Sequence, residues 1–108
     1  MTEAQIQREI VQHLLAWGFT ACPTSQGYRS SPGGTRVHPG LPDLWVMGNG
    51  LGFWCEVKRA KPRGKLRPEQ EVFRDQCLAN GVGWLVAWDV RDVFDYLVAL
   101  GAVEEAAA

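Results

Sequence analysis

Two short apolar runs joined by a glycine-rich turn limit most strongly what this chain can fold into. Residues 43–47 and 53–58 each have the length of a β-strand, and Gly48-Asn49-Gly50 lies between them. A turn of this composition supplies the positive φ angles that a tight β-hairpin requires. The sequence therefore predicts an antiparallel hairpin in the middle of the chain.

Helical patterns lie on both sides of this hairpin. Thr2 and Gln5 have the spacing of a capping box before an apolar stripe. Pro68 suits the first turn of a second helix, which Gly81 can end, and Asp89 can cap a third. The expected elements are helices at 2–17, 68–80 and 90–100, a short strand at 19–22, the hairpin strands at 43–47 and 53–58, and a buried strand at 83–88.

The bulk composition indicates a single domain in residues 1–108, with an alanine-rich tail at about 104–108. A chain of 108 residues, 46% of them apolar, can bury a real core. Its three cysteines match no metal or disulfide spacing and are expected to be reduced, and most of its five tryptophans are expected in the core. With no secretory signal and no membrane-length apolar stretch, we expect a cytoplasmic protein.

Positive charge is concentrated in one segment of a chain whose net charge is only −1. The low net charge argues against a protein that coats nucleic acid non-specifically, whereas a local basic block indicates an edge that faces phosphates. A solvated basic loop without a partner is the alternative. The basic residues of this segment are Lys58, Arg59, Lys61, Arg63, Lys65 and Arg67, and a long loop at 23–40 adds Arg29, Arg36 and His38.

Strand alternation places charged residues together at one end of the hairpin. Glu56 and Lys58 fall on one face of their strand, about 7 Å apart, while Val57 falls on the other. Antiparallel pairing brings Asp43 close to Val57 or Lys58. The charged groups therefore converge without strain.

Helix spacing adds two polar residues to the same region. Glu3 lies on a stripe with Gln7 and Ile10 and is expected to continue a core-facing surface, and Gln70 is expected to face inward. Each residue alone has a simpler explanation, such as a solvated first-turn acid for Glu3 or a plain turn for Pro42-Asp43. Together they describe one pocket that can hold a divalent cation and a water beside a basic surface, as phosphodiester hydrolysis requires.

The ordered motifs resemble a known nuclease family. Pro42-Asp43 followed by Glu56-Val57-Lys58, with Glu3 before them and Gln70 after them, is similar to the PD-(D/E)XK nuclease superfamily. More closely, the chain resembles the stand-alone virus-type replication-repair nuclease (VRR-NUC) domain of phages and bacteria. The resemblance implies an α/β, restriction-endonuclease-like fold, a central mixed β-sheet flanked by helices. The sequence segments that carry the resemblance also include Pro39-Gly40-Leu41, Leu66-Arg67-Pro68-Glu69, Phe73 and Asn80-Gly81.

The resemblance also implies a role for each site residue. Asp43, Glu56 and the backbone carbonyl of Val57 would bind Mg²⁺ or Mn²⁺, which prefer hard oxygen ligands. Lys58 would orient or deprotonate the attacking water. Glu3 would act through water or a second metal, and Gln70 would position Lys58 or the scissile phosphate.

The implied function is a metal-dependent, structure-selective DNA endonuclease without an organic cofactor. Small members of the family are expected to act as homodimers on four-way (Holliday) junctions in DNA repair, in a bacterial or phage-infected cytoplasm. A non-catalytic DNA-binding module and a restriction-type duplex endonuclease are the alternatives. The candidate phosphate contacts are Arg59, Lys61, Arg63, Lys65, Arg29, Arg36 and His38.

Overall fold

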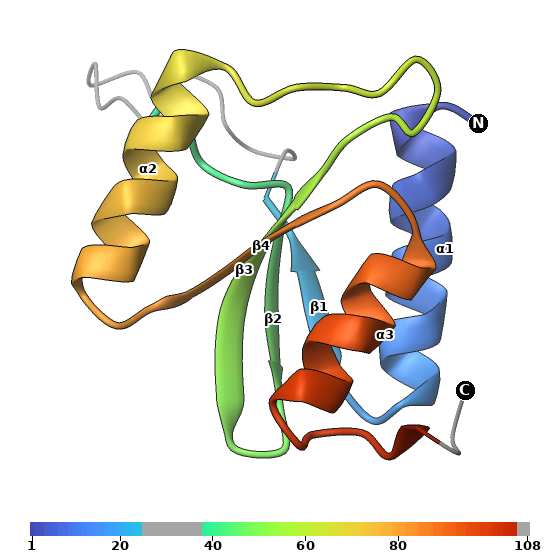
Figure 1. Cartoon of the computed structure of the whole chain (residues 1–108). Helices are drawn as coiled ribbons and strands as arrows, with labels where there is room; N and C mark the ends of the chain where they lie inside the picture. Colours follow the sequence, from blue (N-terminus) through green and yellow to red (C-terminus); the bar gives the residue numbers. More distant parts are fainter. Residues whose placement is uncertain (25–37, 106–108) are drawn as a thin grey trace, which may run out of the picture.

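The computed structural model describes residues 1–24 and 38–105 and contains the predicted order of elements (Figure 1). Each observed boundary is close to the predicted one. The capping box of the first helix is present, because Thr2 and Gln5 exchange hydrogen bonds of 2.7 and 3.1 Å. The elements are α1 (Glu3–Ala16), β1 (Thr20–Pro23), β2 (Leu44–Gly48), β3 (Leu51–Val57), α2 (Pro68–Ala79), β4 (Gly83–Ala87) and α3 (Val90–Ala99).

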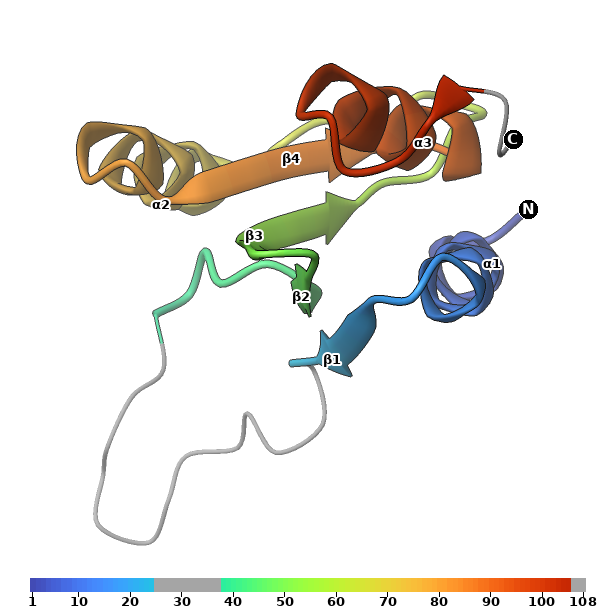
Figure 2. The same ribbon diagram turned by 90° about the horizontal axis from the view of Figure 1, so that it is seen from below.

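The four strands form one mixed sheet in the order β1-β2-β3-β4. The pairs β1–β2 and β2–β3 are antiparallel, and β3–β4 is parallel. Figures 1 and 2 show α2 on one side of the sheet and α1 and α3 on the other. The predicted α/β fold, a mixed sheet flanked by helices, is therefore confirmed.

The hairpin is tighter than the sequence suggested. Gly48 pairs with Leu51, so that only Asn49 and Gly50 form the turn, with φ angles of 51° and 78°. Both strands are correspondingly extended toward the turn. This register places Leu44 opposite Cys55 and determines which residues lie at the far end of β2 and β3.

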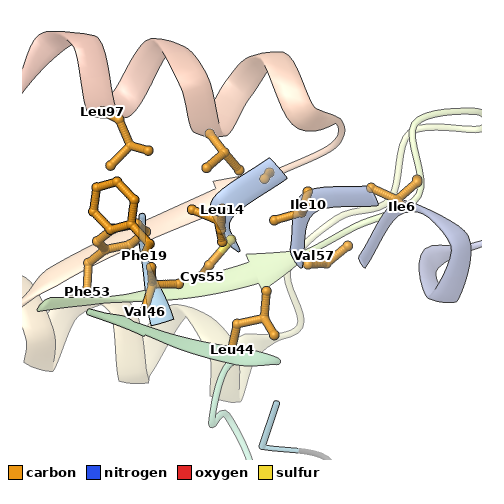
Figure 3. Close-up of a cluster of buried hydrophobic side chains, with 12 residues drawn as sticks. Ile6, Ile10, Leu14, Phe19, Leu44, Val46, Phe53, Cys55, Val57 and Leu97 are labelled. Atoms are coloured by element: carbon orange, nitrogen blue, oxygen red, sulfur yellow. The ribbon is translucent and has the colours of Figure 1, made fainter. Parts of the chain in front are cut away.

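The hydrophobic core lies between the sheet and the pair α1 and α3 (Figure 3). Phe53, Cys55 and Val57 point from β3 into this core, as strand alternation predicted, and none is more than 1% exposed. They meet Ile10 and Leu14 from α1, which are fully buried. Among the described residues, no helix is long and apolar enough to cross a membrane.

Two sequence predictions about burial were wrong. The strand predicted as buried, β4, lies at an edge of the sheet, and all its residues except Ala87 are half-buried. All five tryptophans are half-buried as well, because large indole rings are rarely covered completely in a small domain. The cysteines are free thiols, as predicted.

Candidate functional site

All the predicted catalytic and metal-binding residues except Glu3 meet where β2 begins, β3 ends and α2 begins (Figure 1). Asp43 immediately precedes β2, while Glu56 and Val57 are the last residues of β3 and Lys58 follows them. Gln70 lies in the first turn of α2. Three segments that are distant in sequence thus supply one cluster.

Asp43 is held by hydrogen bonds from two neighbouring segments, the end of β3 and the residue that follows β1. Its Oδ2 accepts a 2.8 Å hydrogen bond from the backbone N–H of Val57, which brings it to the end of β3 as the hairpin register predicted. Its carbonyl accepts another of 2.8 Å from the N–H of Thr24. The Thr24 hydroxyl also donates to the carbonyl of Pro42, whose ring is fully buried. The Pro42-Asp43 step is therefore fixed before any ligand binds.

Glu56 is buried, with only 3% of its surface exposed, although it is a carboxylate. Its Oε1 accepts a 2.9 Å hydrogen bond from Gln70 and lies 3.7 Å from the Lys58 ammonium, whereas its Oε2 is buried without a hydrogen-bond partner. Burial and then the negative charge of Asp43 raise the pKa of Glu56 to about 8, against the opposing effect of Lys58 and Arg67. A buried oxygen without a donor is costly, and a cation would remove that cost.

Gln70 sets the orientation of Glu56. Its Oε1 accepts a 2.8 Å hydrogen bond from the backbone N–H of Arg67, so that the amide nitrogen must face the carboxylate. Gln70 is only 4% exposed and faces inward, as predicted. Its contact is with Glu56, whereas the sequence had suggested Lys58 or the phosphate as its partner.

A third oxygen of this cluster comes from the backbone. The N–H of Val57 points toward Asp43, and the N–H and carbonyl of one strand residue point to the same side. The Val57 carbonyl therefore lies on the side of the Asp43 carboxylate. This set of two carboxyl groups and one carbonyl matches the oxygen ligands that Mg²⁺ and Mn²⁺ prefer. One of its oxygens, Oε2 of Glu56, has no hydrogen-bond donor.

Sequence reasoning did not single out Gly40 as a site residue, although it lies in the Pro39-Gly40-Leu41-Pro42 motif. A Cβ atom at this position would lie 1.9 Å from the backbone oxygen of Glu69, in the first turn of α2. Only glycine allows the segment before Asp43 to lie directly on α2. Its signal in the sequence was its place in the motif, since nothing in the spacing predicts the contact.

The structure does not bring Glu3 into the cluster. Glu3 is exposed and Gln7 is half-buried, so the predicted core-facing surface was wrong, because α1 is buried against the sheet only from Ile6 onward. Within residues 1–24 and 38–105, no three or more His, Cys, Asp or Glu side chains gather at one point. The role of Glu3 stays a prediction.

The predicted phosphate contacts fall into three groups. Arg29 and Arg36 lie outside the described residues. His38 is half-buried, with its ring 5.1 Å from that of Phe73 and its Nδ1 2.9 Å from the N–H of Gly40, so it packs beside the site. The remaining four are exposed and lie in the segment 59–67, which we call the basic connector. These residues are Arg59, Lys61, Arg63 and Lys65.

Comparison with known proteins supports the fold. No protein-family model matches the sequence, and no curated protein matches it. A solved structure of a "VRR_NUC domain" superposes with a TM-score of 0.67 and 24% sequence identity, covering 92% of this chain and 97% of that chain. The chain therefore has the fold of a VRR_NUC domain, which is the fold that the sequence motifs implied.

Proposed function

We propose that this protein is a divalent-metal-dependent DNA nuclease. The observation that carries the proposal is the meeting of Asp43, Glu56 and Lys58 at the end of β3, with one buried Glu56 oxygen left without a donor. The fold shared with a VRR_NUC domain supports it, because the residues that suggested this family, apart from Glu3, are the ones that meet.

Asp43, Glu56 and the Val57 carbonyl would hold Mg²⁺ or Mn²⁺. Such a cation, when bound, supplies Lewis-acid activation of water and of the phosphate. Gln70 keeps the Glu56 carboxylate in one orientation through its 2.9 Å hydrogen bond. These residues therefore place the ligand oxygen atoms before the substrate arrives.

Lys58 completes the proposed chemistry. Its Nζ lies 3.7 Å from Glu56 Oε1 and the residue is only 8% exposed, so that the ammonium is positioned to orient the attacking water, whereas deprotonating that water would require the neutral amine. The ammonium also offsets negative charge that builds on the phosphate. Hydrolysis joins the water oxygen to phosphorus, breaks the bond to the leaving sugar oxygen and leaves a proton on that oxygen.

Four-way DNA junctions cut by a homodimer are the proposed substrate and assembly. Two sites related by a two-fold axis can cut two strands of a symmetric branch. A restriction-type enzyme would instead cut a linear duplex, and a non-catalytic DNA-binding module would bind without cutting. The three functions therefore differ in whether DNA is hydrolysed and in which form of DNA is cut.

One substrate panel tests the proposal. The wild-type protein and Asp43→Ala are incubated with four-way junction, flap, single-stranded and linear duplex DNA, with Mg²⁺, with Mn²⁺ and with EDTA. We expect the wild type to cut the junction when either metal is present, EDTA to abolish the cleavage, and Asp43→Ala to be inactive. Cleavage that persists in EDTA would refute metal dependence, and preferred cleavage of linear duplex would favour the restriction-type function. Sedimentation should show a dimer.

A further inference from the structure

Trp88, which follows β4 directly, contacts two residues of the basic connector, Arg63 and Gly64, and Gly64 in turn lies beside Lys58. We infer that Trp88 is a positioning residue that holds Lys58 through its indole N–H and Arg63 through its ring, an inference that rests on the proposed function. Trp88 is half-buried, and its backbone N–H donates a 2.8 Å hydrogen bond to Asp92 in the first turn of α3. The side chain therefore projects from a fixed base.

The indole N–H holds the connector against Lys58. It donates a 2.9 Å hydrogen bond to the carbonyl of Gly64, whose own N–H donates one of 2.7 Å to the carbonyl of Arg59. The Gly64 backbone lies so close to Lys58 that a Cβ on Gly64 would be 3.3 Å from the Lys58 Cβ. Because Gly64 lies beside the Lys58 Cβ, we expect that fixing Gly64 limits where the ammonium can reach.

The indole ring supports a different residue. The Arg63 guanidinium carbon lies 3.6 Å from the centre of the Trp88 ring, which is the geometry of a cation–π contact. Arg63 remains exposed, so its charge is available to a DNA phosphate. The ring thus fixes the direction of one cation of the basic connector beside the site.

The two parts of the indole should therefore affect two kinetic constants. Loss of the N–H bond frees Gly64 and Lys58, which lowers the rate of the chemical step at saturating DNA. Loss of the Arg63 charge weakens a phosphate contact, which raises KM. A merely structural role for Trp88 would lower the amount of folded protein without separating kcat from KM.

The experiment compares three variants on the DNA that the wild type cuts. Trp88→Phe keeps an aromatic ring and removes the N–H, and we expect kcat to fall about tenfold with KM nearly unchanged. Arg63→Gln should raise KM roughly threefold to tenfold with kcat nearly unchanged. Trp84→Phe is the matched control, because Trp84 lies in β4, the strand that Trp88 follows, and its buried indole nitrogen has no hydrogen-bond partner. It should retain both constants.

Gly64→Ala tests the contact between Gly64 and Lys58 directly, since its methyl group would press on the Lys58 Cβ. It should lower kcat even if Trp88→Phe folds poorly, and thermal unfolding of each variant reports the folded fraction. Equal kcat for Trp88→Phe and Trp84→Phe, or an unchanged kcat for Gly64→Ala, would overturn the inference while leaving the nuclease proposal intact. A wild type that cuts no DNA with metal would overturn both.

Discussion

The two faces of β3 have opposite chemistry although their residues alternate along one strand. On one face, Phe53 and Cys55 are at most 1% exposed and pack under α1 and α3 (Figure 3). On the other face, Glu56 and the following Lys58 are also buried, yet one Glu56 oxygen has no hydrogen-bond partner. The first face stabilises the fold. The second face holds the Glu56 carboxyl in place, although burying its unpartnered oxygen costs free energy. Stability and activity should therefore respond to different substitutions.

The largest expected effect is on the core face. Phe53→Ala should lower the free energy of unfolding by about 3–5 kcal/mol, because it removes a buried ring and leaves a cavity. Urea unfolding followed by tryptophan fluorescence measures this change. The cleavage rate per folded molecule should stay near that of the wild type. A stable Phe53→Ala protein with slow cleavage would mean that the two faces are not separable.

The next effect is on the opposite face. Asp43→Asn keeps an oxygen that can accept from the Val57 N–H but removes the charge, so cleavage should slow by at least ~100-fold. This loss corresponds to about 2.7 kcal/mol of transition-state stabilisation. The melting temperature should not fall, since the variant removes one of two neighbouring carboxylates. Near-normal cleavage by Asp43→Asn would exclude the residue from the reaction.

The same comparison shows what the sequence could predict. Strand alternation assigned Phe53 and Glu56 to opposite faces, and the predicted hairpin around Gly48-Asn49-Gly50 brought Asp43 to the end of β3. These predictions succeeded because a side-chain period of two and a hairpin register are local properties of the chain. The fold and the meeting of the charged residues were accessible for that reason.

Predictions that depended on long-range packing were incomplete. Helical spacing could place Glu3 on a stripe but could not show that α1 is buried only from Ile6 onward. Nothing local indicates that Gly40 lies on the backbone of Glu69 or that Trp88 binds Gly64. Such contacts depend on how separate elements pack against one another. A short sequence motif contains no information on the distance between residues of different elements.

Gly40→Ala tests how strongly the polar face depends on α2. The new methyl group would collide with the backbone of Glu69, so that α2 or the segment before Asp43 must shift. We expect about 1–3 kcal/mol of lost stability, typical of overpacking, together with slower cleavage. Pro39→Ala, at the exposed neighbouring position, is the control and should change cleavage little. An unaffected Gly40→Ala protein would show that this contact does not hold the site together.

The smallest expected effects lie in the basic connector, whose exposed charges should act on binding and leave the chemical step alone. Lys61→Gln and Lys65→Gln should each weaken DNA binding a few-fold and reduce the slope of log K against log salt by about 0.9, the value for one phosphate contact. Binding measured between 50 and 200 mM salt, roughly the range in which such slopes are resolved, gives this number. Arg74→Gln is the control, because Arg74 lies further along α2 and pairs with Asp75 at 3.0 Å. If the control changes the slope as much as the connector variants do, the positive charge acts through the overall field of the protein and no phosphate is bound at Lys61 or Lys65.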